Sequence, residues 1–384
     1  MAQSPAKPLP DVGPPRAGRA VRIAVMVNNM GGYSRGVLRG ISSFAFAKAW
    51  ECKVQGVNSW GGLDSPAEFD GWIVQAIAAD VAGDLHSAGV PVVNISSALG
   101  NANLPSVVAD DLAVGRAGAD YFLRLGFRSF AFFSPQDRQF TRLRHEGFTR
   151  RLQETNNRNE LLTTENDLEA ALYRLPRPLA VMAATDLAAL SVLDKCRAHR
   201  LKVPDDIAIL GVDNDDLIQS LAFPPLSSIN MATDRIGFEA AAMLERLLSG
   251  EALASSRLLI PPLGVITRQS SDVMAIGDRD VGEAVRYIRD HAAAAISVDD
   301  VSRSVVISRR QLERRFRAVL GRSVFDEIKR CRIERAKQLL NETELTIPQI
   351  ATASGFSTAS YFTVVFGDAV GSTPGAYRKQ VRGR

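Results

Sequence analysis

Residues 308–317, with the sequence SRRQLERRFR, combine a helical spacing of apolar residues with a high density of long hydrogen-bond donors. Leu312 and Phe316 lie four residues apart and are expected to face the core of a domain. The other faces would offer polar side chains to base edges if the helix lay in a DNA major groove: Arg309, Arg310, Gln311, Glu313 and Arg314. Arg315 and Arg317 would then contact phosphates. The alternative is a basic helix that is only exposed to solvent. The sequence around the helix is needed to distinguish this from a DNA-binding helix.

The helical stretch around this segment is internally repeated, because apolar, small and glycine positions recur 49 or 50 residues later. The pairs are Leu312 with Phe362, Phe316 with Phe366, Gly321 with Gly371, Val301 with Ile350, and Ser302 with Ala351. Helix starts are marked by cap residues that have a partner three positions on: Ser297 with Asp300, Ser308 with Gln311, and Thr346 with Gln349. Each copy therefore predicts a short helix, a tight turn and a second helix, which is a helix-turn-helix.

The charge of the chain is divided unevenly. From residue 281 onward there are 18 Lys or Arg against 11 Asp or Glu, a net charge of +7, whereas the preceding residues carry a net charge of −3. A basic excess confined to the region with the repeated helices indicates a polyanionic partner for that region.

The motifs of this region resemble those of the AraC family of transcription regulators over residues 284–380. They are SRRQLERRFRAVLGRS, RIERAKQLL, TIPQIATASGF, SYFTVVF and GSTPGAYR. The resemblance implies two helix-turn-helix units joined by one long helix at about residues 325–340, each unit placing a recognition helix in the major groove of double-stranded operator DNA. In the second unit it places Thr358, Ala359 and Ser360 at the DNA.

Two departures from the family pattern stand out. The family carries Arg at the position of Val364 and Lys or Arg at the positions of Gly367 and Asp368, so the second unit is expected to lack phosphate contacts. In the first unit Val306 occupies the turn position that Gly355 fills in the second. A β-branched residue adopts positive φ only at a cost, which predicts a first turn of different construction.

Residues 21–272 alternate short apolar runs with helical stretches. Examples of the runs are VRIAVMV (21–27), SFAFFS (129–134), LAVMAAT (179–185) and DIAILGVDN (206–214). Near-continuous apolar strands separated by helices predict parallel sheets covered on both faces, and the length of the region favours two lobes. Ligands of such folds bind at the carboxyl ends of the strands, in the crevice between the lobes.

The remaining boundaries follow from composition. Residues 1–20 are proline-rich and lack an apolar period, so they are expected to form a disordered tail. The α/β pattern ends at residue 272, a linker is expected at 273–281, and the double helix-turn-helix domain at 282–384.

The α/β region resembles the periplasmic-binding-protein-like sensors of LacI-type regulators. A LacI-type chain begins with its own helix-turn-helix, whereas this sequence begins its α/β pattern directly with a strand. A sensor of this kind ahead of an AraC domain resembles the regulators of xylose operons. That resemblance implies a small sugar effector, D-xylose first, together with a homodimer formed through the sensor lobes, activation of transcription and a contact with RNA polymerase.

The resemblance to LacI-type motifs also suggests sugar-binding residues. Arg144 of RHEGF falls at a sugar-clamping arginine, Asp213 of GVDN at a sugar-binding carboxylate, and Thr185 of AATD at a ligand-facing polar position. Asp186 is either a further ligand or the N-cap of the next helix. Tyr33 and Phe140 are weaker candidates, as aromatic faces that stack on a sugar; the alternative is that they belong to the core. Ser34 is a further candidate, at a position where the xylose regulators commonly carry an acid.

Several functions find no support in the sequence. Three cysteines and four histidines lie far apart and predict neither a disulfide framework nor a metal site, and no cofactor motif occurs. An α/β enzyme or transport-type binding protein with a helical appendage is the rival, but no GxSxG, GxxxxGK[ST] or GxGxxG motif is present. No secretory signal or long apolar stretch occurs, so a cytoplasmic location without a membrane partner is expected.

Overall fold

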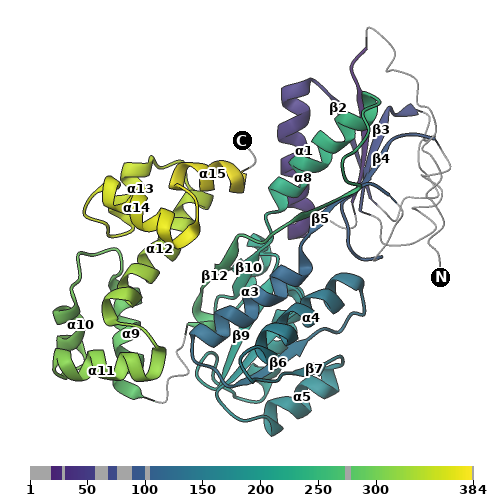
Figure 1. The fold of residues 1–384 in the computed structure, drawn as a ribbon. Coiled ribbons are helices and arrows are strands. Elements are labelled where there is room, and N and C mark those ends of the chain that lie inside the picture. Colours follow the sequence, from purple (N-terminus) through teal and green to yellow (C-terminus); the bar gives the residue numbers. More distant parts are fainter. Residues whose placement is uncertain are drawn as a thin grey trace.

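The structure, a computed structural model, describes residues 19–27, 31–56, 68–75, 89–99, 104–272 and 278–382. Figure 1 shows two stacked α/β lobes and, beside them, an all-helical domain that contains the C-terminus. Most of the expected tail at 1–20 and part of the expected linker at 273–281 lie outside the described residues. Among the helices that are described, none is long and apolar enough to cross a membrane.

The first lobe is built on a six-stranded parallel sheet of order β11-β5-β4-β3-β1-β2. Its strands are β1 (Arg22–Val27), β2 (Glu51–Gly56), β3 (Gly71–Val74), β4 (Val92–Asn94), β5 (Ser106–Ala109) and β11 (Arg257–Ile260). The central strand β1 is apolar and buried from Ile23 to Val27, and β3 is buried along its whole length, because both faces of the sheet are covered, as predicted. α1 (Gly32–Lys48) and α8 (Thr233–Leu248) pack together on this lobe.

The second lobe has a six-stranded sheet of order β12-β10-β9-β8-β6-β7, in which only β12 runs antiparallel to its neighbour. Its strands are β6 (Ser129–Phe133), β7 (Glu160–Leu162), β8 (Leu179–Ala183), β9 (Ile207–Val212), β10 (Ser227–Asn230) and β12 (Gly264–Ile266). Its helices are α3 (Asp111–Arg124), α4 (Gln139–Gln153), α5 (Glu165–Arg174), α6 (Asp186–Ala198) and α7 (Asp216–Leu221), and the short 3-10 helix η3 (Gln269–Ser271) follows β12.

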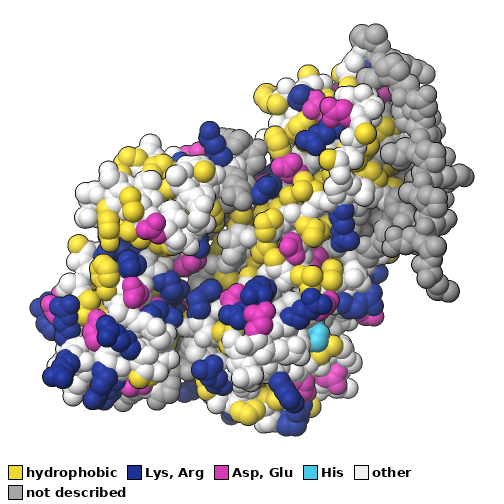
Figure 2. All heavy atoms as spheres, viewed as in Figure 1, with side chains coloured by type: hydrophobic (Ala, Val, Ile, Leu, Met, Phe, Trp, Pro, Cys, Tyr) yellow, Lys and Arg dark blue, Asp and Glu magenta, His cyan; other side chains and the backbone are white. Residues whose placement is uncertain are grey.

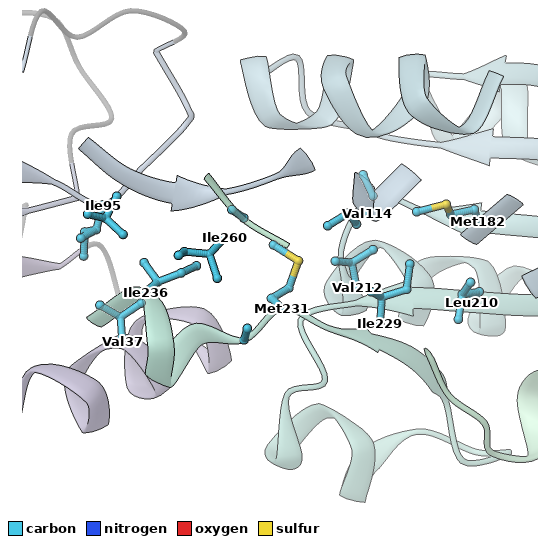
Figure 3. Packing of buried hydrophobic residues seen from close by; sticks show 14 of the residues in the cluster. Val37, Ile95, Val114, Met182, Leu210, Val212, Ile229, Met231, Ile236 and Ile260 are labelled. Carbon is cyan, nitrogen blue, oxygen red and sulfur yellow. The ribbon is translucent and has the colours of Figure 1, made fainter. Parts of the chain in front are cut away.

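The chain passes between the lobes three times, after β5, after β10 and after β11. One apolar core runs through this junction. In Figure 3, Met231 lies between Ile236 and Ile260 of the first lobe and Val212 and Ile229 of the second. Because the lobes share a packed core at the crossings, a change in the angle between them must act on these residues.

The helical domain contains α9 (Arg279–His291), α10 (Val298–Ser304), α11 (Arg309–Leu320), α12 (Val324–Glu342), α13 (Ile347–Ala353), α14 (Ala359–Val370) and α15 (Pro374–Arg382). The three predicted capping boxes, at Ser297, Ser308 and Thr346, are all formed. The long helix α12 joins two small cores, one around Leu312 and Phe316 and the other around Phe362 and Phe366. α9 begins inside the expected linker, because Asp278 caps it.

The expectation for the first turn was wrong. Val306 adopts a left-handed backbone with φ of 56°, and Gly355, its counterpart in the second turn, has φ of 84°. The two turns are therefore alike, and the first bears the steric cost of a β-branched residue in this region. The Val306 side chain is 90% exposed, so no burial of apolar surface offsets that cost.

Candidate functional site

The centre of the inter-lobe site is an ion pair between α4 and the first residue of α3. The Arg144 Nε donates to Asp111 Oδ1 at 2.9 Å, and the guanidinium also donates to the Ala184 carbonyl. The Phe140 ring lies against the same guanidinium, with its centroid 4.9 Å from Cζ. Phe140 therefore acts as a cation–π partner of Arg144, a contact that neither the stacking nor the core interpretation included.

Close packing of α3 on α4 places this pair. A Cβ atom added to Gly115 would lie 1.9 Å from the Arg144 carbonyl oxygen, so only glycine allows the two helices to approach so closely. Asp111 also accepts a hydrogen bond from Ser97, which belongs to the first lobe. Burial raises the pKa of Asp111, whereas Arg144 and Ser97 lower it.

Tyr33, near the start of α1, brings the first lobe to the same cluster. Its hydroxyl donates to the Ile95 carbonyl at 2.6 Å. Burial raises the pKa of Tyr33, Asp111 and Asp213 raise it further, and Arg144 lowers it, so all three charges lie near its hydroxyl. The structure thus brings together four of the predicted residues, with Asp111 as an addition: Tyr33, Phe140, Arg144 and Asp213.

Asp213 follows β9 and is held in a strained loop. Its φ is 113°, in the region that favours glycine, and the next residue, Asn214, is also at positive φ. Asn214 is fixed at both ends: its N–H donates to Ser228 Oγ at 2.9 Å, and its side-chain oxygen accepts from Arg268 at 2.8 Å. Burial raises the pKa of Asp213 to about 7. A strained backbone and a carboxyl group that is costly to ionise are together typical of a ligand site.

The capping role expected for Asp186 belongs to Thr185. The Thr185 hydroxyl accepts from the Ala188 N–H at 3.1 Å and caps α6, so this oxygen is engaged within the helix. Asp186 is fully buried and accepts from the Asp215 N–H at 2.8 Å and from Ser228 Oγ at 2.6 Å. Asp186 therefore supports the Asp213 loop, and burial together with Asp213 raises its pKa to about 8.

Asp215, which sequence reasoning missed, joins the two lobes. Its carboxylate accepts from the Gly32 N–H at 2.7 Å and pairs with Arg35 at 2.6 Å, both on α1 of the first lobe. A Cβ atom on Gly32 would lie 2.7 Å from the Asp215 Cβ, so glycine is required for this approach. The acidic run DNDD was the visible signal, but its partners lie about 180 residues earlier in the chain.

Ser34 follows Tyr33 on α1. It is 2% exposed, and its hydroxyl donates to Gln75 Oε1 at 3.1 Å, just beyond β3. Within the described ranges, no group of three or more His, Cys, Asp or Glu residues is arranged to hold a metal ion.

The second candidate surface is the outer face of α11. Its polar side chains Arg309, Arg310, Gln311, Arg314 and Arg317 are exposed, and Figure 2 shows Lys and Arg side chains gathered over this end of the helical domain. Arg309 is paired with Asp299 at 3.3 Å on α10, an exposed pair that DNA phosphates could replace. Glu313 is half-buried and set back from this face.

Arg315, which was predicted to contact phosphates, is engaged within its own domain. Its guanidinium pairs with Asp278 and Asp280 at the start of α9, so it ties the recognition helix to its own domain. The sequence did not reveal this role because the two acids lie more than 30 residues away.

In the second unit, α14 offers much less charge. Thr358 caps the helix by accepting from the Tyr361 N–H at 3.2 Å, Ala359 is half-buried and Ser360 is exposed. Val364 is 61% exposed at the position that corresponds to Arg314. Asp368 is the only charged residue of α14, whereas α11 carries five arginines and one glutamate.

A two-lobed domain with a buried polar cluster between its lobes, followed by two helix-turn-helix units, defines a transcription regulator with its own sensor. Residues 119–271 match the periplasmic binding protein-like domain and residues 301–380 match a helix-turn-helix domain. The chain therefore has the two domains of an AraC-type regulator with a periplasmic-binding-protein-like sensor, the organisation that the sequence predicted.

Relatives of the same organisation cover nearly the whole chain. The xylose operon regulatory protein of Escherichia coli (strain K12) is 29% identical, with 93% of this chain and 96% of that protein covered. The protein of that name from Haemophilus influenzae is 27% identical, with coverages of 93% and 98%. These relatives are transcription regulators and not enzymes.

Solved structures match either nearly the whole chain or about two thirds of it. A xylose-binding transcription activator has a TM-score of 0.61 at 27% identity and covers 94% of this chain and 98% of that one. A regulator in complex with cellobiose, CelR, has a TM-score of 0.55 at 23% identity, covers 65% of this chain and 84% of that one, and supports the fold of the sensor.

Proposed function

We propose that this regulator controls a sugar-catabolic operon and that its effector is a small sugar bound between the lobes, with D-xylose as the first candidate. The observation that carries the proposal is the cluster of Tyr33, Asp111, Arg144 and Asp213, to which both lobes contribute; Asp111 and Arg144 are buried, and Tyr33 and Asp213 are half-buried. Guanidinium and carboxylate groups held in place are suited to paired hydrogen bonds with vicinal hydroxyls. The xylose-binding activator and the xylose operon regulators support the choice of sugar.

In this proposal the sugar acts by stabilising the closed arrangement of the lobes. A hydroxyl that accepts from Arg144 and donates to Asp213 would hold parts of α4 and the β9–α7 loop, while Tyr33 approaches from the first lobe. The Asp215 contacts with Gly32 and Arg35 would form only when the lobes close. A ligand that prefers the closed state shifts the population toward it, and the attached helical domain follows.

The helical domain would bind operator DNA mainly through α11. Two copies joined through their sensor lobes would place two such domains on adjacent sites, which increases affinity through effective concentration. By similarity to the xylose-binding activator, the regulator would activate transcription. We propose that it does so through a contact with RNA polymerase.

A thermal-shift screen of pentoses and hexoses tests the effector. A ligand at a hundredfold excess over its dissociation constant stabilises the folded state by about 2.7 kcal/mol. We expect D-xylose to raise the melting temperature and L-arabinose, D-ribose and D-glucose to raise it less. If another sugar raises the melting temperature more than D-xylose does, that sugar becomes the proposed effector. Ser34 would give a reason, because it stands where the xylose regulators commonly carry an acid. No shift with any sugar would contradict the proposed class of effector.

A further inference from the structure

A second cavity, of about 270 Å³, lies between the sensor and the helical domain. The sensor contributes the end of α3 and β12 to its wall, and the helical domain contributes α9, α12 and Tyr377 of α15. The domains touch at its rim, where the Tyr377 hydroxyl donates to the Leu263 carbonyl at 3.4 Å and Arg289 of α9 pairs with Asp272. The cavity is large enough for a small metabolite.

Arg124, the last residue of α3, projects into this cavity. Its side chain remains exposed, and surrounding protein lowers its pKa by desolvation, so it lies in a recess between the domains. Within the part of the chain that the structure describes, no hydrogen bond or ion pair engages its guanidinium. A guanidinium in a solvent-filled recess has five donors available, and its planar fork fits a carboxylate or phosphate group.

The other cations of the cavity wall are already engaged. Arg330 pairs with the fully buried Glu327 at 2.6 Å, and Lys337 pairs with Glu334 at 3.0 Å. Arg335 donates to the Ala353 carbonyl at 2.8 Å. Five cationic and three acidic side chains line the cavity, and Glu327 adds one acid behind Arg330, so a single positive charge remains in excess. Among the described residues, neither Arg124 nor Arg335 is bound directly by an acid, but Arg335 is engaged by a carbonyl and Arg124 is not.

The wall also offers main-chain donors. β12 is the edge strand of its sheet, and residues 264–267 line the cavity. The side of an edge strand that faces away from the sheet presents N–H groups to whatever lies beside it.

The position of the cavity connects it to the movement of the lobes. Asn230 and Leu263 lie at two of the three crossings between lobes, and both line this cavity as well as a separate one of about 250 Å³ that contains Asp213. A ligand held at Arg124 would therefore contact the hinge of the sensor from the side of the helical domain.

We propose that this inter-domain cavity binds a small oxyanion, a phosphate monoester or a carboxylate, with Arg124 as its principal contact. The anion would join α3 of the sensor to α9 and α12 of the helical domain, so it would act as a second effector at a site separate from the sugar cleft.

Calorimetry on the full chain in chloride buffer at low ionic strength tests this site. The probes are inorganic phosphate, glycerol 3-phosphate and malate, each compared with sodium chloride of equal ionic strength. We expect saturable binding of at least one probe. Binding of inorganic phosphate or glycerol 3-phosphate would indicate a phosphate ligand, and binding of malate a carboxylate ligand. Arg124→Gln should weaken that binding by about tenfold or more, because a charge-assisted pair is lost.

Arg128→Gln is the matched control, since Arg128 is an exposed arginine four residues away that does not line the cavity. It should leave binding of the probe within about twofold of wild type. D-Xylose affinity should be unchanged in Arg124→Gln, which separates this site from the cleft. The proposal is overturned if no probe binds the wild type saturably, or if both variants bind the probe as the wild type does or lose it equally.

Discussion

The Arg144 guanidinium and the Asp111 carboxylate meet 2.9 Å apart between the lobes, and their side chains are only 4% and 1% exposed. Arg144 thus neutralises a buried acid, in addition to the sugar contact that we propose for it. Removing one partner of such a pair leaves an uncompensated charge, which costs about 3 to 5 kcal/mol.

Arg144→Ala should therefore lower the free energy of unfolding by about this amount and also abolish sugar binding. Arg144→Ala with Asp111→Asn should recover part of the stability, because the stranded carboxylate is gone, without recovering the affinity for sugar. Urea denaturation and calorimetry measure the two effects. If Arg144→Ala proves as stable as wild type, the ion pair has no structural role.

Asp213 and Asp186 predict a dependence of stability on pH. Their pKa values are raised to about 7 and about 8, mainly by burial, from about 4 in the unfolded chain. Between pH 4 and 8 the folded state therefore binds more protons than the unfolded state, so these groups make stability fall as the pH rises. Asp213→Asn should flatten this fall. Urea titrations from pH 5 to 8 without sugar measure the free energy of unfolding of the wild type and of Asp213→Asn. If this free energy falls with pH equally in both proteins, the Asp213 carboxyl group does not contribute to the fall.

The turn of the first helix-turn-helix unit predicts a stabilising substitution. Val306→Gly should raise the free energy of unfolding by about 0.5 to 1 kcal/mol, because relief of about 1 to 2 kcal/mol of left-handed strain exceeds the entropic cost of glycine. Gly355→Val should destabilise strongly, since its Cβ would lie 2.2 Å from the Ala292 carbonyl oxygen. Circular dichroism during urea denaturation compares the two. A destabilised Val306→Gly would mean that the valine has a favourable role.

Much of the fold was predictable because periodicity and cap residues are local. The strands β1, β6, β8 and β9 and the capping boxes at Ser308 and Thr346 follow from such patterns. The site was only partly predictable, since Asp111 and Asp215 owe their roles to partners that the lobes bring together. Thr185 and Asp186 are both good N-cap residues, and only the structure shows which one caps α6.

The recognition helices should contribute unequally to DNA binding. Arg314→Ala should cost about 1 to 3 kcal/mol on operator DNA if the side chain reaches a base, and Arg317→Ala should reduce the salt slope by roughly one unit if it reaches a phosphate. Ser360→Ala should cost much less than Arg314→Ala, because α14 has little charge or reach. Fluorescence anisotropy at several salt concentrations measures these effects. If Arg314→Ala and Ser360→Ala lose equal affinity for operator DNA, the second unit contributes as much to DNA recognition as the first.

The central claim is that a sugar in the inter-lobe cleft controls DNA binding by the helical domain. It is tested most directly by anisotropy titrations of the full chain on DNA from upstream of its neighbouring genes, with and without D-xylose at one salt concentration. We predict a change in affinity of about tenfold on one fragment, none on scrambled DNA, and loss of the sugar effect in Asp213→Ala. Equal affinity with and without a sugar that calorimetry shows to be bound, or a sugar effect that survives in Asp213→Ala, would contradict the account.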